Sequence, residues 1–376
     1  MQSLTQSPRS NLTAAQVISL ITGSSLNVTS GLELLDNSNN FVGDISSTLV
    51  SGTVERHNLA TIHGICNLVL EGSLYWGKDR IRPYLTLSNG LISARFNLGV
   101  FVIQTPKANL QENPITYAVT GYDLLCFLDV AVGDSYAVTA GTTYFSAIQS
   151  ILTALSIGST LYLDGTLQST TLPNDMVWAL APTTKTTWLE IINDLLGSIN
   201  YRPLWADENG NFRSSPAILP SFRPVEWVLD TANSSTNIVA PVRSVTGDVF
   251  DAHNWWRFVR TPMTVKPVEG AGIYTVTNAS TGRTSVASIG RTIKAPVQFL
   301  TAADQTSLVA QGNAIVAADQ SVSRTFTIAI DPLPIAGHLD IVQFNDNGAI
   351  DICQTISWVI DLMGAPSQWV MEAVNA

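Results

Sequence analysis

Apolar and polar residues alternate with a period of two over much of the first third of the chain. The alternation starts near Leu26 and continues, with interruptions, to about Asp129. Such alternation is typical of strands that bury one face and expose the other. Asn89-Gly90, between two of these runs, is typical of a tight hairpin turn. The pattern therefore predicts a β-rich block over this region.

Helical spacing replaces the alternation in the middle of the chain. The run from Tyr144 to Leu155 predicts one helix, and the run from Trp188 to Ile199 predicts a second. Thr187 with Glu190 three residues later matches a capping box at the start of the second helix. The period then returns to two around Asn209-Gly210, which predicts a hairpin. The second helix places on one face Trp188, Ile191, Ile192, Leu195, Leu196 and Ile199.

Strand patterns return in the last third, after a proline-rich linker at 214–227. Strands are expected from about Ser244, and residues 301–320 predict a helix with Thr301 and Asp304 as a box-like start. Residues 324–374 read as strands again, and 13–21 as a short opening helix. The fold class expected is mainly β with an α/β insertion, α+β overall.

Composition favours extended contact surfaces without strong charge. Charged residues make up 13% of the 376 residues, about half of the ~25% typical of soluble domains. The formal net charge is −10, and no basic stripe is visible. Proteins that grip nucleic acid need such a stripe to release counterions. The balance argues against a nucleic-acid-binding protein and fits either a surface that DNA passes without sticking or a protein that does not contact DNA at all.

Cysteine count and hydropathy exclude several classes of site and segment. Cys66, Cys126 and Cys353 are far apart and odd in number, so neither a disulfide framework nor a zinc site is expected. The N-terminus lacks the apolar core of a signal peptide. Residues 135–163 carry no charge, but they are rich in Ser, Thr and Gly, which argues against a membrane span. We expect no metal and no cofactor.

The acids of the hairpin at 205–212 are the first candidates for chemistry. Asp207 and Glu208 precede Asn209-Gly210, a combination that superficially resembles a calcium loop. An EF-hand needs glycine at the sixth position, whereas Gly210 comes fourth in this loop. The hairpin interpretation, with both acids solvated at the turn, is therefore favoured.

Histidines and motifs give no catalytic site. His57 and His63 are expected on one strand, too far apart to share a metal. His338 and Asp340 are expected to form a surface pair. The chain has no G-x-S-x-G string and no phosphate-binding G-x-x-x-x-G-K-[ST] loop. We expect no enzyme activity.

Two aromatic pairs are candidate carbohydrate or partner contacts. They are Trp255 with Trp256, and Tyr75 with Trp76. Core packing on a strand is the favoured interpretation of both pairs, because aromatic side chains contribute large apolar area to a sheet core.

An ordered series of strings resembles the hub proteins of phage tail tips and baseplates, the minor tail proteins of siphophages. The series begins with VERHNLATIHGICNLVL, LYWGKDRIRPYLTLSNG, ARFNLGVFVIQTP and YAVTGYDLLCFLD. It continues with TTWLEIINDLLGSINYRPLWADENGNFRSSP and APVRSVTGDVFDAHNWWRFVR, and ends with SIGRTIKAPVQF, DPLPIAGHLDIVQF and SWVIDL. Together these strings span roughly residues 26–376.

The resemblance implies two β-barrel-like hub domains and two smaller domains in a multidomain, ring-forming protein. Transferred to this sequence, it implies an N-terminal helical arm at 1–25 and a first hub domain at 26–135, completed by about 226–250. It further implies an inserted α/β domain at 136–225, a third β-rich domain at 251–300, and a second hub domain with one helix at 301–376.

The resemblance also implies a role. Three copies would form a pseudo-sixfold ring that surrounds the DNA exit channel in the virion tail tip. The implied partners are the distal tail protein below the hexameric tube, the tape-measure C-terminus, and tip, fibre or receptor-binding proteins. Genomic DNA would pass without specific binding, along a neutral or acidic wall. Because the sequence ends at Ala376 after the last strand pattern, we expect host binding and wall cleavage to belong to other chains.

Two alternatives stay open at this point. A carbohydrate-binding adhesin of the tail would use the aromatic pairs, and it requires them to be exposed. A cell-wall hydrolase would rest only on scattered Asp, Glu and His residues.

Overall fold

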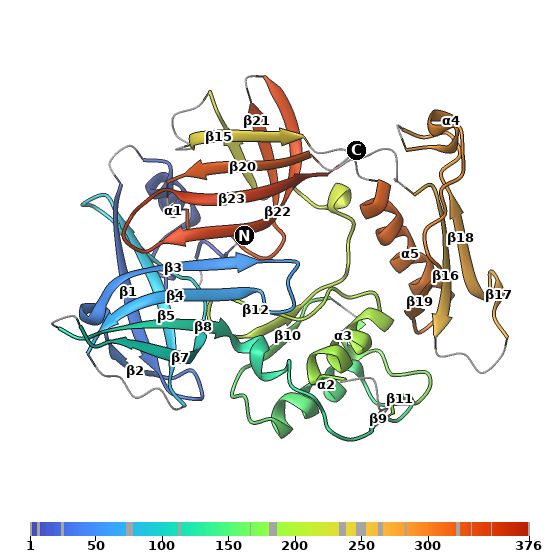
Figure 1. Cartoon of the computed structure of the whole chain (residues 1–376), viewed down its shortest axis with the longest axis horizontal. Helices are drawn as coiled ribbons and strands as arrows, with labels where there is room; N and C mark the ends of the chain where they lie inside the picture. Colours follow the sequence, from blue (N-terminus) through green and yellow to red (C-terminus); the bar gives the residue numbers. More distant parts are fainter. Residues whose placement is uncertain are drawn as a thin grey trace.

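Strands predominate in this computed structural model, and the few helices cover their sheets or edges (Figure 1). The prediction of a mainly β chain is confirmed. The structure describes residues 2–5, 8–23, 26–72, 78–111, 114–165, 167–179, 186–232, 238–245, 253–261, 266–282, 284–320, 324–331, 333–346 and 348–374.

The first half of the largest sheet is built from the alternating segments near the N-terminus. Its strand order is β2-β1-β5-β7-β8-β4-β3, with β6 paired to β5. All these pairs are antiparallel, and their inward residues form one apolar core. The strands are β1 (Asn27–Leu35), β2 (Phe41–Asp44), β3 (Leu49–His57), β4 (Gly64–Glu71), β5 (Arg80–Ser88), β6 (Ser93–Asn97), β7 (Phe101–Asn109) and β8 (Thr116–Asp123), with a 3₁₀ turn η1 (Ser46–Thr48).

The second half of the sheet comes from the C-terminal strands and two strands of the preceding segment. β14 pairs with β21, and β15 pairs with β20. Residues 226–250 were expected to complete the first hub domain, but the pairing places their strands in this second half. The strands are β14 (Trp227–Asp230), β15 (Ile238–Val245), β20 (Arg324–Ile330), β21 (Ile341–Asp346), β22 (Ala349–Asp361) and β23 (Ser367–Ala373), after a 3₁₀ turn η4 (Pro220–Phe222).

A seam between β3 and β22 joins the two halves into one sheet. Five residue pairs form it, from Ser357 opposite His57 to Asp361 opposite Thr53. Among the described strands the path ends at β15 and β2, which do not pair with each other. Two separate barrel-like sheets were expected; the described strands form one open, continuous sheet instead.

The opening helix α1 (Ala14–Ile21) packs against the first half of the sheet. Thr13 caps it in a capping box with Gln16. Val17, Leu20 and Ile21 are buried in the sheet core, and Arg9 Nη1 donates to the carbonyl oxygen of Arg95 at 2.6 Å. The helix predicted over 13–21 is therefore present, but it is docked on the sheet and does not extend as an arm.

The inserted α/β segment lies below the sheet (Figure 1). The capping box of Thr187 and Glu190 is confirmed at the start of α3, whose apolar face is buried in a second core shared with the hairpin β12–β13. The 3₁₀ turn η2 (Leu124–Phe127) leads into the segment. It contains β9 (Tyr136–Val138), α2 (Tyr144–Ala154), β10 (Leu161–Leu163), η3 (Leu167–Ser169), β11 (Met176–Trp178), α3 (Trp188–Ser198), β12 (Trp205–Ala206) and β13 (Phe212–Ser214).

A small sheet with its own helix stands apart at the other edge of the molecule (Figure 1). Its strand order is β17-β18-β16-β19, and α5 packs on one face. A Cβ on Gly312 would lie 2.7 Å from the Phe258 ring, so glycine permits this close packing. The elements are β16 (Trp255–Thr261), β17 (Val268–Glu269), β18 (Gly272–Thr277), α4 (Val286–Ile289), β19 (Gln298–Thr301) and α5 (Gln305–Gln320).

The position of α5 changes two expectations. The helix was expected within the second hub domain, but its buried residues Leu308 and Val316 pack with the small sheet. Thr301 and Asp304 were expected as a box-like start of the helix. Thr301 instead ends β19, and the side chain of Asp304 accepts a hydrogen bond from the amide of Ser307 at the helix start.

Across the described ranges no helix combines the length and apolar character needed to cross a membrane.

Candidate functional site at the junction of three segments

The tip of the β12–β13 hairpin is buried against the first half of the large sheet. Asp207 is only 6% exposed. Its Oδ1 accepts hydrogen bonds from the amides of Asn209 and Asn211, both at 2.9 Å, and its Oδ2 pairs with Arg213 at 2.7 Å. The hairpin prediction is correct, but the expectation of a solvated acid is wrong for Asp207, because the tip docks onto another part of the chain; Glu208 is half-buried.

Two contacts explain why the tip fits there. Gly210 has a φ of 79°, in the left-handed region, and a Cβ at this position would lie 2.8 Å from the Val100 side chain. Asn209 Oδ1 accepts a hydrogen bond from Asn97 Nδ2 at 2.7 Å. The Asn-Gly pair therefore serves both the turn geometry and the docking of the tip.

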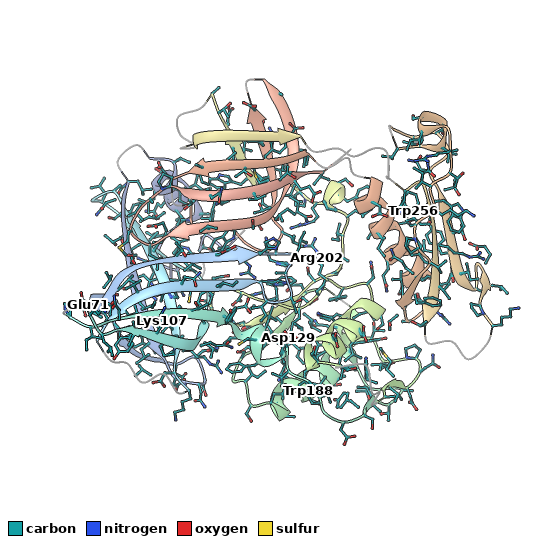
Figure 2. The ribbon with its side chains drawn as sticks, in the orientation of Figure 1. Glu71, Lys107, Asp129, Trp188, Arg202 and Trp256 are labelled. Carbon is teal, nitrogen blue, oxygen red and sulfur yellow. The ribbon has the colours of Figure 1, made fainter. Side chains whose placement is uncertain are left out.

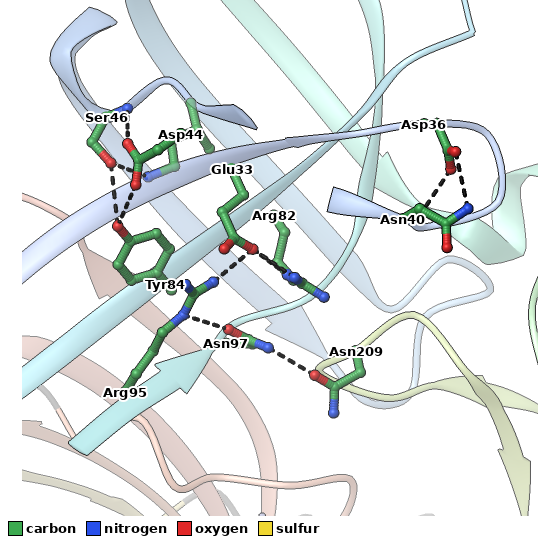
Figure 3. A network of polar contacts seen from close by, with 11 residues as sticks. Glu33, Asp36, Asn40, Asp44, Ser46, Arg82, Tyr84, Arg95, Asn97 and Asn209 are labelled. Atoms are coloured by element: carbon green, nitrogen blue, oxygen red, sulfur yellow. Dashed lines mark hydrogen bonds and ion pairs between the residues drawn. The ribbon is translucent and has the colours of Figure 1, made fainter. Parts of the chain in front are cut away.

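A chain of polar contacts continues from Asn97 into the sheet (Figure 3). Arg95 Nε donates to Asn97 Oδ1, and Arg95 and Arg82 each place an Nη2 atom 2.6 Å from Glu33 Oε2. Burial acts to raise the pKa of Glu33, but the two arginines outweigh it, so the pKa lies below its usual value. This carboxylate is therefore held ionised and anchors the arginine that reaches toward the hairpin.

Arg56, at the end of β3, lies at the centre of the junction. It is 8% exposed, and its Nη2 donates to the carbonyl oxygen of Ala206 at 2.6 Å. Burial lowers its pKa, and the nearby Asp123, Glu208, Asp207 and Asp340 act in the opposite direction. An arginine guanidinium stays protonated in proteins even when burial lowers its pKa. Arg56 is therefore a buried cation, and several acids surround it.

Two of these acids are buried enough to change their titration. Asp123 accepts hydrogen bonds from the amides of Gly64 and Leu125, but desolvation raises its pKa to about 6. Desolvation also raises the pKa of Glu208, with a further contribution from Asp207. Both carboxyls therefore lie in an environment that disfavours their charge despite the adjacent arginine.

His338 connects the second half of the sheet to the junction around Arg56. Its ring stacks between His63, at a centroid distance of 5.0 Å, and Trp205, at 4.5 Å. Burial lowers the pKa of His338, and it lowers that of His63 to about 3. Both rings are therefore neutral at physiological pH, since the neighbouring Arg56 also disfavours their protonation.

Asn58 fixes the tautomer of His338. Its Nδ2 donates to the carbonyl oxygen of Thr355, so its Oδ1 must accept from both Arg56 Nε and His338 Nδ1, each at 3.2 Å. The expected surface pair of His338 with Asp340 is replaced by this buried stack. His57 and His63 were expected on one strand, but they face each other across a hairpin, with the His57 amide 2.7 Å from the His63 carbonyl.

Two clefts meet at His338. The first has a volume of about 320 Å³, and half of its lining residues are Asp, Glu or Arg; the second, about 490 Å³, lies toward the start of α3. Arg202, whose burial lowers its pKa to about 10, lies in the first cleft between the large sheet and the insertion (Figure 2). Within the described ranges, no group of three or more His, Cys, Asp or Glu side chains is placed to hold a metal ion.

The chemistry of this junction fits a structural role, in which it holds segments of the chain together. General bases work best with a pKa near the operating pH, and the pKa of His63 lies far below it. The pKa of Asp123 is closer, at about 6, but this carboxyl is buried, accepts hydrogen bonds from two backbone amides and lines neither cleft. Burial raises the pKa of the Cys66 thiol and brings that of Cys126 to about 12, which disfavours a nucleophilic thiolate. The arrangement therefore holds three chain segments together through Arg56, the acids around it and a ring stack.

The sequence signal that could have found this site is Arg56 itself. In the alternation of β3, Val54 and Arg56 lie on the same side, and both are buried. A cation on the inward face of a strand requires buried acids nearby, and this requirement alone predicts a polar centre under the sheet.

The candidate aromatic residues lie elsewhere. Trp256 is fully buried under α5, and its Nε1 donates to Asp319 Oδ2 at 2.7 Å (Figure 2). Trp255 is half-buried with Lys294 Nζ 4.9 Å from its ring centroid. Tyr75 and Trp76 lie outside the described residues. Neither Trp255 nor Trp256 belongs to the junction.

The arrangement of one large sheet, an inserted α/β segment and a separate small sheet is found in solved structures. A tail protein from Neisseria meningitidis MC58 superposes with a TM-score of 0.62, covering 93% of this chain and 97% of that one at 11% identity. The chain has the fold of phage tail proteins.

Two further solved structures agree with this tail-protein fold. The 43 kDa tail protein of prophage MuSo2 from Shewanella oneidensis has a TM-score of 0.57 at 14% identity, covering 92% of this chain and 98% of that one. The prophage tail protein gp18 from Listeria monocytogenes EGD-e has a TM-score of 0.52 at 12% identity, covering 92% and 95%. No family model and no curated protein matches the sequence.

Proposed function

We propose that the chain is a structural hub of a phage tail tip. The observation that carries this proposal is the likeness of fold to phage tail proteins over more than nine-tenths of both chains. The buried junction supports it, because Arg56, His338 and the hairpin tip lock the insertion to both halves of the sheet. A hub needs such internal rigidity if it is to hold the neighbouring proteins in fixed positions relative to one another.

The finer role is a homotrimeric ring. The two halves of the large sheet would give six similar units from three copies. Such a ring matches the hexameric tail tube and distal tail protein on one side and the tip or fibre proteins on the other. It surrounds the DNA exit channel of the virion and contacts the tape-measure C-terminus. The net charge of −10 suits a wall that DNA passes without binding.

Light scattering of the purified chain, followed by electron microscopy of assembled tails, tests the ring. We expect a mass of three copies and threefold symmetry at the tip. A monomer at all concentrations, or a ring of another order, would refute the trimer. A continuous lining of Arg and Lys in the channel would refute the proposed passage of DNA.

A carbohydrate-binding adhesin remains the second candidate, and among the described aromatic residues it rests on Trp255. Glycan binding by wild type and by Trp255→Ala separates the two functions. We expect no glycan to bind in a way that depends on this residue. Saturable binding that the substitution abolishes would favour the adhesin, and clearing of host peptidoglycan in a zymogram would favour a hydrolase.

A further inference from the structure

The small sheet has one covered face and one open face. Trp256, Phe258 and Leu300 point to α5. Because side chains alternate along a strand, their neighbours point the other way. α5 lies between this sheet and the rest of the molecule, so the open face is directed outward (Figure 1). We call it the outer face, formed by Trp255, Arg257, Val259, Ile273, Val297 and Phe299.

Strand register places an apolar row across the outer face. Val259 lies opposite Ile273 on β18 and opposite Phe299 on β19. Phe299 is 68% exposed and Val297 is 47% exposed. An exposed phenylalanine within a row of apolar residues is typical of an interaction surface rather than of isolated surface side chains.

Cations flank the apolar row. Arg257 lies on the next row, opposite Thr275, and Lys294 lies against Trp255 at the end of the strand. Residues 253–320 contain six Arg and Lys against three Asp and Glu, although the whole chain has a net charge of −10. The outer face therefore belongs to a basic part of an acidic protein. A surface complementary to it would be acidic, with apolar residues at its centre.

The inserted segment carries such a surface. Residues 129–199 contain one Lys against six Asp and Glu. On the two-stranded sheet β9–β11, Val177 lies opposite Ala137 and is 64% exposed, while Val138 and Met176 are buried beneath. Asp134 and Asp175 are exposed near opposite ends of this pair of strands. An apolar centre flanked by two carboxylates matches an apolar row flanked by two cations.

We propose that the outer face of one copy docks onto the β9–β11 face of a neighbouring copy. Within one chain the insertion contacts α5 and the end of β19: Gln311 on α5 donates to the carbonyl oxygen of Gly197, and the amide of Ala303 donates to that of Ser198. The outer face points away from this contact, so a second copy must supply the acidic partner. A contact between two different patches is head-to-tail, the kind of contact from which closed rings are built. The inference rests on the proposed ring and names the surfaces that close it.

Charge reversal tests the contact. Arg257→Glu with Lys294→Glu places like charges opposite Asp134 and Asp175, and we expect the ring to dissociate, with at least a tenfold weaker association in sedimentation. Asp134→Arg with Asp175→Arg should have the same effect. All four substitutions in one chain restore opposite charges at every contact, and this chain should form the trimer again.

Controls separate assembly from folding. Lys78→Glu with Lys107→Glu makes the same change in net charge on exposed residues of the first half of the sheet, and it should leave the trimer intact. Circular dichroism and the unfolding midpoint of each variant establish that it is folded. Phe299→Asp, which tests the apolar row without reversing a charge, should also dissociate the ring.

The outcomes distinguish the two proposals. A wild-type chain that stays monomeric refutes the ring and, with it, the contact. A wild-type trimer that survives both Arg257→Glu with Lys294→Glu and Phe299→Asp overturns the contact alone. Dissociation that the fourfold variant does not rescue overturns the assignment of β9–β11 as the partner. A variant that trimerises but fails to enter tails assigns the outer face to a different tail protein and overturns the inference.

Discussion

Docking of the hairpin tip can be measured at Gly210. Gly210→Ala would force a methyl group into the left-handed region at a φ of 79° and to within 2.8 Å of the Val100 side chain. The backbone conformation costs about 1 kcal/mol, and overpacking a closed contact costs about 1–3 kcal/mol more. We therefore expect the free energy of unfolding to fall by about 2–4 kcal/mol.

Gly133→Ala is the matched control. Gly133 has a φ of 77°, but nothing lies within 4 Å of a Cβ at this position. This substitution carries the backbone cost alone, about 1 kcal/mol. The difference between the two variants therefore isolates the contact between the hairpin and the sheet.

Urea unfolding, followed by tryptophan fluorescence and circular dichroism, measures both variants. Hydrogen exchange of the amides from Asp207 to Asn211 gives a local measurement that does not require two-state unfolding. We expect faster exchange at the tip in Gly210→Ala than in Gly133→Ala. Equal losses of stability with unchanged exchange would refute the docking of the tip.

Three further predictions follow from buried groups. Arg56→Met should lower the free energy of unfolding, measured by urea titration, by about 3–5 kcal/mol, because it leaves buried acids without this cation. A loss below about 1 kcal/mol would contradict the central role of Arg56. The pKa of Asp123 is about 6 in the folded chain, against 3.8 for an unperturbed aspartate, so the folded chain binds this proton more tightly than the unfolded chain. The stability of wild type relative to Asp123→Asn should therefore fall by about 2 kcal/mol as the pH rises from about 4 to 7, and a pH-independent difference would count against the burial of this carboxyl. Gly312→Ala should destabilise the protein by about 1–3 kcal/mol, because the new Cβ meets Phe258. Gly197→Ala in α3 should stabilise it by about 0.5–1 kcal/mol, because nothing lies within 4 Å of a Cβ there. Shifts of the thermal unfolding midpoint in the same direction for both variants would refute the packing of α5.

Local features were predictable from the sequence because their determinants lie within a few residues. The capping box of Thr187 and Glu190 and the Asn209-Gly210 turn depend only on neighbouring residues, and the structure has both. The period-two runs likewise became strands, since burial of one face requires that alternation.

Long-range pairing was not predictable by the same means. β14 and β15 carry no signal that distinguishes pairing with β21 and β20 from pairing with the first half of the sheet, because strands of similar composition are interchangeable in pattern. Asp207 looked like a solvated turn acid since nothing in residues 205–212 shows that Val100 and Asn97 receive the tip. Burial of a turn is a property of its partner, which lies more than a hundred residues away.

The seam between β3 and β22 has a mechanical consequence. Its paired residues run from Thr53 to His57 on one strand and from Ser357 to Asp361 on the other. A force that slides one half of the sheet past the other along the strands loads the hydrogen bonds of the seam together, whereas a force that separates the strands breaks them one after another. The seam therefore resists sliding of the two halves along β3 better than it resists their separation.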